Sequence, residues 1–159
     1  MSETGSEERD GGGVNGEFRA LLEGLRTSLP GVQVLFAFLL IAPFQTEFSN
    51  LSGAEVASHA LAFYASGAAI ILLIAPSAHQ RFRAPLTGLK RRSRRHLIVT
   101  TWLTIAGTCT MGVAMAATSH LVSSMLFGAA TAIAATATAG ALIGWAWVYI
   151  PLVTFRRLD

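Results

Sequence analysis

The fold is decided by residues 96–155, which read HLIVTTWLTIAGTCTMGVAMAATSHLVSSMLFGAATAIAATATAGALIGWAWVYIPLVTF. This stretch contains no Lys, Arg, Asp or Glu, and most of its residues are apolar. One helix needs about 20 apolar residues to cross the roughly 30 Å hydrocarbon core of a membrane. The stretch is therefore long enough for two spans, and we expect a tight turn between them at Thr118, Ser119 and His120.

Two further uncharged stretches precede this one. The first lies between Arg26 and Glu47, and the second lies between Glu55 and Arg81. The chain has 159 residues and is 13% charged, whereas soluble domains average about 25%, so the composition excludes an ordinary soluble domain. The sequence predicts an all-α integral membrane four-helix bundle in residues 30–159. Its spans are expected at about 31–48, 54–76, 97–117 and 121–150.

The residues before the first span divide into a tail and a short helix. Residues 1–14 are rich in Ser, Glu and Gly, so they bury too little apolar surface to fold, and we expect a disordered cytoplasmic tail. Residues 15–29 are expected to form an amphipathic helix, which Pro30 and Gly31 separate from the first span. Such a helix lies in the membrane interface or packs against the cytoplasmic end of the bundle. Its apolar face consists of Phe18, Leu21, Leu22, Leu25 and Leu29.

Basic residues are distributed unevenly among the expected loops. Residues 45–54, between the first two spans, include no Lys or Arg. The loop between the second and third spans holds Arg81, Arg83, Lys90, Arg91, Arg92, Arg94 and Arg95. Because cytoplasmic loops carry the excess of basic residues, we expect a protein of the cell (inner) membrane with both termini and this loop in the cytoplasm. We expect the loop to contact anionic lipid headgroups. It offers only Phe82 as a stacking aromatic and has no room for a folded module, so we expect no nucleic-acid partner.

Small residues recur at every fourth position along the expected fourth span. They are Gly128, Ala132, Thr136, Gly140 and Gly144. Small residues at this spacing let two helix backbones approach closely, and packing is the main drive for helix association in lipid. We expect Gly128, Ala132 and Thr136 to pack on the third span, and Gly140 and Gly144 to contact the first span or a second copy.

The polar residues of the spans form no pattern typical of a catalytic or metal site. No paired carboxylates, phosphate loop or metal-ligand spacing occurs, so we expect neither enzyme activity nor a cofactor. Ser52 and Glu55 have the spacing of a capping box at the start of the second span, and His59 is expected as an interfacial or helix-bonded residue. Gln33 and His79 are expected at the cytoplasmic ends of their spans, where they form a small polar cluster that is either functional or a hydrogen-bonded anchor for the amphipathic helix.

Two segments resemble an uncharacterised bacterial family of small four-span membrane proteins. The first is residues 22–44, with LPGVQVLFAFLL at its centre, and the second is LLIAPSAHQR at residues 72–81. The resemblance covers the chain from about Phe18 onward. It implies a membrane protein with cytoplasmic termini and supplies no catalytic residues. Some relatives carry antiporter labels, which the lack of a carboxylate inside any expected span argues against here.

The function expected from these features is not enzymatic. We expect an integral membrane protein that acts through helix-mediated assembly or as an accessory subunit. The alternative is a small oligomeric transporter or channel lined by the threonine-rich third span and by the fourth. The expected partners are a bilayer with anionic headgroups and either further copies of the chain or another membrane protein.

Overall fold

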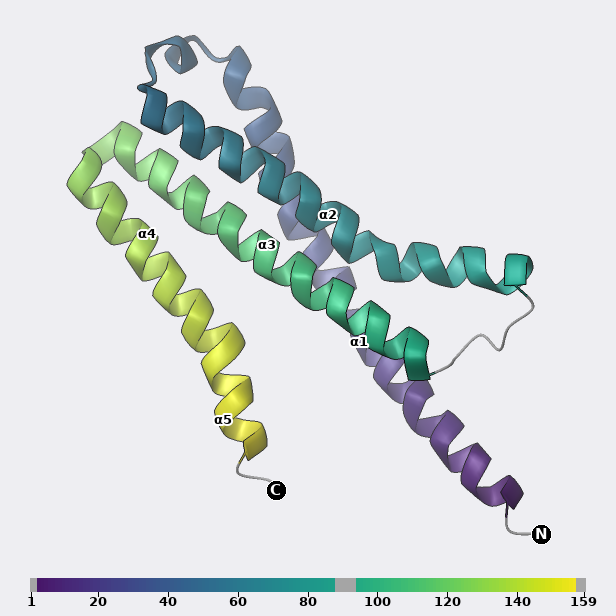
Figure 1. Ribbon diagram of the computed structural model, residues 1–159. Coiled ribbons are helices and arrows are strands. Elements are labelled where there is room, and N and C mark those ends of the chain that lie inside the picture. The colour runs from purple at the N-terminus through teal and green to yellow at the C-terminus, as the bar shows by residue number, and fades with distance from the viewer. Residues whose placement is uncertain (1–2, 88–93, 157–159) are drawn as a thin grey trace. The chain divides into compact units, whose positions relative to one another are not determined.

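The computed structural model describes residues 3–87 and 94–156, and every regular element in these ranges is helical (Figure 1). The order along the chain is α1 (Glu3–Ile41), η1 (Ala42–Phe44), η2 (Thr46–Asn50), α2 (Gly53–Thr87), α3 (Arg94–Phe127), α4 (Ala129–Gly144), η3 (Trp145–Tyr149) and α5 (Ile150–Arg156). Both η1 and η2 are 3₁₀ turns, and η3 is a π-helical turn.

Four helical segments are long and apolar enough to cross a membrane. They are Leu22–Phe44, Gly53–His79, Leu97–Phe127 and Ala129–Val153. The prediction of an all-α chain with four such segments is confirmed among the described residues, although their boundaries differ from those expected.

Helix α1 runs through Pro30 without a break and begins at Glu3. The sequence instead predicted a disordered tail over residues 1–14 and a separate helix ending at residue 29. An internal proline removes one helical hydrogen bond and crowds the carbonyl four residues before it, and buried residues on both sides of Pro30 offset this cost. Leu25 and Val32, two helical turns apart on the same face, are 3% and 1% exposed.

The reversal between the last two spans lies at Gly128, and the turn predicted at Thr118, Ser119 and His120 is wrong. Those three residues lie inside α3. Thr118 and Ser119 donate their hydroxyl hydrogens to the carbonyls of Ala114 and Met115, one turn back in the same helix. Hydroxyl side chains bonded in this way fit inside a helix. Gly128 has φ of 86° and ψ of 176°, a conformation that essentially only glycine adopts.

The fourth span includes a π-helical turn before Pro151. The N–H of Ile150 donates to the carbonyl of Trp145, five residues back, instead of four. Pro151 has no N–H to donate, and its ring would clash with the carbonyl four residues before it. The wider π turn relieves this clash, so that α4, η3 and α5 continue as one helical segment.

The helices divide into two compact units, of which the first comprises residues 1–35 and 68–109. Its buried side chains include Leu25, Val32, Leu73 and Thr100. Gly107 of α3 lies so close to α2 that a Cβ at this position would be 2.9 Å from two side-chain carbons of Leu73. Glycine at this position therefore allows close packing of α2 on α3.

The second unit comprises residues 36–67 and 110–159. Phe36 of α1 stacks on Phe63 of α2, with the ring centroids 5.0 Å apart. A Cβ at Gly112 of α3 would lie 3.2 Å from Ile143 of α4 and 3.3 Å from Trp147 of η3. Within this unit α3 and α4 run side by side in opposite directions from the turn at Gly128 (Figure 1).

We expect Gly128→Ala to lower the free energy of unfolding by about 1–3 kcal/mol, because a Cβ is strained at this φ and ψ. The matched control is Gly140→Ala, at an exposed helical position with open space around it. There, alanine favours the helix by up to about 1 kcal/mol. Unfolding of both variants is measured in the same detergent. Unchanged stability of Gly128→Ala would contradict the strained turn.

Candidate functional site

The stripe of small residues predicted to pack in the fourth span divides into three parts. Gly128 is the turn before α4 and is not part of a helix, which corrects its expected role in helix packing. Ala132 is fully buried and Thr136 is half-buried. The Nδ1 of His120 lies 3.1 Å from Oγ1 of Thr136, which itself donates to the carbonyl of Ala132. This part of the stripe therefore faces α3.

Gly140 and Gly144 form the third part of the stripe and have open space around them. Both residues are exposed, and a Cβ at either position would meet no atom within 4 Å. Whether the first span or a second copy covers these glycines stays a prediction. The second half of the stripe is thus an exposed edge of α4.

Close approach of helix backbones depends instead on glycines that the sequence analysis did not single out. Gly107 and Gly112 of α3 are both buried, and a Cβ at either would lie 3.3 Å or less from side chains of a neighbouring helix. They are five residues apart and so lack the four-residue spacing that marked the α4 stripe. The sequence gives only one sign of their role. Glycine is unfavourable inside a helix, so its presence there suggests that close packing requires it.

A network of hydrogen bonds joins the start of α2 to α3. The predicted capping box is confirmed, because the Glu55 carboxylate accepts from both the N–H and the hydroxyl of Ser52 at 2.8 Å. The other carboxylate oxygen of Glu55 accepts from the hydroxyl of Ser124 at 2.7 Å. One side chain therefore caps α2 and holds α3 against it.

His59 makes the corresponding connection between α1 and α2. It is buried, and its Nε2 lies 2.8 Å from the carbonyl oxygen of Leu39. The imidazole packs edge-on against Phe48, 5.0 Å away, and stacks on Phe63, 6.4 Å away. His59 is thus helix-bonded, and its partner is a different helix from its own.

The threonine hydroxyls of α3 are bound to their own helix. Thr100, Thr104 and Thr108 donate to carbonyls three or four residues back, at 2.8–2.9 Å. A hydroxyl bonded in this way needs no partner outside the helix. These contacts explain how the three threonines fit in an apolar helix.

The polar residues expected at the cytoplasmic face are exposed. Gln33 lies on α1 and His79 on α2, both in the first unit, and their clustering stays a prediction. Arg81 is also exposed. Lys90, Arg91 and Arg92 lie outside the described residues, as do the side chains of Arg83, Arg94 and Arg95.

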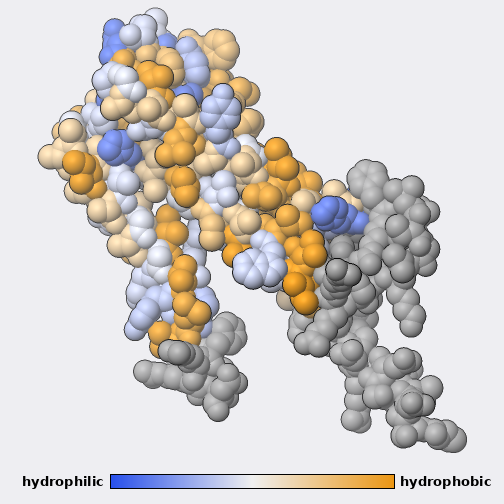
Figure 2. Space-filling view, in the orientation of Figure 1, coloured by the Kyte–Doolittle hydropathy of each residue, from blue (hydrophilic) through white to orange (hydrophobic). Residues whose placement is uncertain are grey.

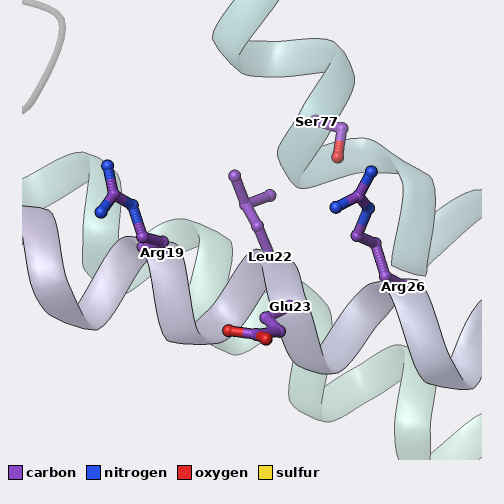
Figure 3. A pocket seen from close by; sticks show the side chains of 5 residues that line it. All are labelled: Arg19, Leu22, Glu23, Arg26 and Ser77. Atoms are coloured by element: carbon purple, nitrogen blue, oxygen red, sulfur yellow. The ribbon is translucent and has the colours of Figure 1, made fainter.

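A pocket of about 520 Å³ lies between α1 and α2 in the first unit, and the sequence analysis missed it. Its lining consists of Arg19, Leu22, Glu23, Arg26 and Ser77. Figure 3 shows both guanidinium groups on the side of α1 that faces Ser77, with Leu22 between them. The Glu23 carboxylate lies along α1, away from Ser77 (Figure 3). The sequence shows only that Arg19 and Arg26 are seven residues apart, which places them on one helical face.

The described residues contain no group of three His, Cys, Asp or Glu side chains placed to hold a metal ion. Their other notable features are the pocket with two arginines in the first unit, and the exposed glycine edge and hydrogen-bonded helix contacts in the second unit.

The fold defines an all-α protein with four helices long and apolar enough to span a membrane. Residues 7–151 match the family of unknown function DUF6328, and the chain belongs to that family. No curated protein and no solved structure matches the chain.

We expect the Ser124–Glu55 hydrogen bond to appear as a coupling energy between the two helices. In a double-mutant cycle of Glu55→Ala and Ser124→Ala, the double variant should lose less stability than the two single variants lose in sum, because either substitution alone already removes the bond. Pairing Glu55→Ala with Ser49→Ala is the control, because the Ser49 hydroxyl donates to the carbonyl of Thr46. Denaturation in detergent measures all variants. Additive losses for Glu55 and Ser124 would show that the bond contributes nothing.

Proposed function

We propose that this chain is a multi-pass protein of the cell membrane that acts by helix-mediated assembly and has no enzymatic activity. The contact surface is the edge of α4 at Gly140 and Gly144, and its occupant is the same edge of a second copy. The observation that carries the proposal is the open space at both glycines. Two copies of one small-residue edge are complementary about a twofold axis, so one surface suffices for a dimer.

The exposed side chains support placement in a bilayer. Phe38, Phe44 and Ile71 are 74%, 82% and 71% exposed, and Figure 2 shows hydrophobic residues over much of the visible face. Soluble monomers rarely expose apolar surface on this scale. Hydrocarbon is the solvent in which these side chains are stable.

The distribution of charge supports an orientation with both termini in the cytoplasm. The basic loop between α2 and α3 follows the second span, and residues 45–54 and the turn at Gly128 include no Lys or Arg. Under the positive-inside rule, the basic loop is cytoplasmic and the other two connections are outside. The first turns of α1 then lie on the cytoplasmic side.

The threonines of α3 favour assembly over the transport alternative. A transport path through hydrocarbon needs side chains that offer hydrogen bonds to the passing solute or ion. The hydroxyl hydrogens of Thr104, Thr108 and Thr118 are committed to carbonyls of their own helix. By contrast, the glycine edge of α4 is free to receive another helix.

We expect the double variant Gly140→Leu, Gly144→Leu to abolish a cross-linked dimer without unfolding the chain. Each leucine enters open space in the monomer, but it holds two α4 backbones apart in the dimer. Cross-linking in membranes measures the dimer, and melting in detergent measures the fold. Ala134→Leu is the matched control, because Ala134 is exposed on a different face of α4. A wild-type chain that never cross-links to itself, or a double variant that dimerises fully, would contradict self-assembly.

The orientation is tested with single cysteines in a Cys109→Ser background. Cysteines replacing Asn50 and Ala130 should react with a membrane-impermeant thiol reagent on intact cells. A cysteine replacing Ser93, which lies between basic residues in the sequence, should react only after the cells are opened. The reverse pattern would show that the termini are outside.

A further inference from the structure

We propose that the pocket between α1 and α2 binds the phosphate group of an anionic phospholipid through Arg19 and Arg26. The inference goes beyond assembly through α4 and depends only on the proposed placement in a membrane. It concerns α1 and α2 of the first unit, and none of the residues that line the pocket belongs to the basic loop.

The two arginines have the chemistry that phosphate recognition requires. A guanidinium group presents a planar set of donors that binds phosphate oxygens with two parallel hydrogen bonds. Both Arg19 and Arg26 are exposed, and neither forms an ion pair within the described parts of the chain. At 1.5 Å of rise per residue, their Cα atoms are about 10.5 Å apart along the helix, a distance that two long side chains can close.

The remaining lining residues fit a headgroup joined to acyl chains. Leu22 lies between the arginines and supplies an apolar surface, and Ser77, across the pocket on α2, supplies a hydroxyl that can donate to a phosphate or glycerol oxygen. The volume of about 520 Å³ falls in the range of about 300–1,000 Å³ typical of small-molecule sites. The pocket therefore has room for a glycerophosphate group.

The position along the helices favours a lipid over a soluble phosphate ester. The apolar segment of α1 begins at Leu22, and that of α2 ends at His79, two residues after Ser77. The pocket thus lies where both spans pass from hydrocarbon to the headgroup layer. Basic pockets between helices at this level are typical sites for anionic headgroups.

Glu23 offers a further test of the proposal, because its negative charge opposes the binding of a phosphate group. Its carboxylate belongs to the pocket lining but lies away from Ser77 in Figure 3. A carboxylate in the lining of the pocket repels a phosphate group and weakens its binding. A purely structural role for the pocket would give Glu23 no such effect.

The test is a lipid titration of the purified full chain in detergent, followed by its melting temperature. Phosphatidylglycerol should raise the melting temperature, and phosphatidylcholine should not. Arg19→Gln with Arg26→Gln should weaken the apparent affinity for phosphatidylglycerol at least about tenfold, since one hydrogen bond to a charged group is worth about this factor. Glu23→Gln should strengthen it.

Two further variants separate a built site from general surface charge. Arg19→Lys with Arg26→Lys keeps the charge but loses the paired donors, so it should bind almost as weakly as the glutamine variant. Arg81→Gln with Arg83→Gln removes the same charge from α2 and should lose less than the pocket variant. Full binding by the lysine variant, or equal losses from the two glutamine variants, would overturn the proposal.

A soluble ligand and the assembly variant complete the experiment. Glycerol 3-phosphate carries the same phosphate without acyl chains. At the concentration at which phosphatidylglycerol saturates the shift, it should leave the melting temperature unchanged. Equal binding of both would assign the pocket to a soluble phosphate ester and overturn the lipid proposal. The variant Gly140→Leu, Gly144→Leu leaves the pocket residues intact, so its lipid affinity separates a failure of assembly from a failure of this site.

Discussion

Hydrocarbon supplies no hydrogen bonds to the backbone, and the other features of this structure depend on that constraint. Each N–H and carbonyl inside a membrane must find a partner in the protein, so spans are helical. The irregular points obey the same rule. At the turn, Gly128 donates to Ser124 and its own carbonyl accepts from Ala132. Before Pro151, the helix widens into a π turn that keeps a hydrogen bond at Ile150. The threonines of α3 satisfy their hydroxyls within the helix for the same reason.

The same solvent weakens the attraction between helices, because lipid chains are as apolar as leucine. In the second unit, a polar contact joins each pair of successive helices. His59 reaches the carbonyl of Leu39, Ser124 donates to Glu55, and His120 contacts Thr136. The last of these contacts fixes which face of α4 lies on α3. A Cβ at either outer glycine of the stripe would meet no atom within 4 Å, and this open space is the surface on which the proposed assembly depends.

Composition and charge were enough to predict the helical class, the four apolar segments and the capping box, because each is a local property. The turn predicted at Thr118, Ser119 and His120 is misplaced, because a run of polar residues indicates a turn only where water surrounds the chain. In lipid, a hydroxyl bonded to its own helix is as acceptable as an apolar group, and the conformation of Gly128 decides the turn instead. Contacts between distant residues could not be predicted. Glu55 and Ser124 are 69 positions apart, and nothing in either segment identifies the other.

The continuity of α1 gives the arginine pocket its geometry. Had the chain broken at Pro30, the residues before it would form a helix free to lie flat in the interface, with Arg19 and Arg26 beside many headgroups. In the structure Leu25 and Val32 are buried on one face across Pro30, so α1 stays a single rod alongside α2 in the first unit. Arg26 lies four residues into the apolar segment Leu22–Phe44, close to the level proposed for the lipid headgroups. In the proposed site, a phosphate would pair with Arg19 and Arg26 while its acyl chains stay in the bilayer. The packing of α1 on α2 in the first unit therefore sets the geometry on which the proposed lipid site depends.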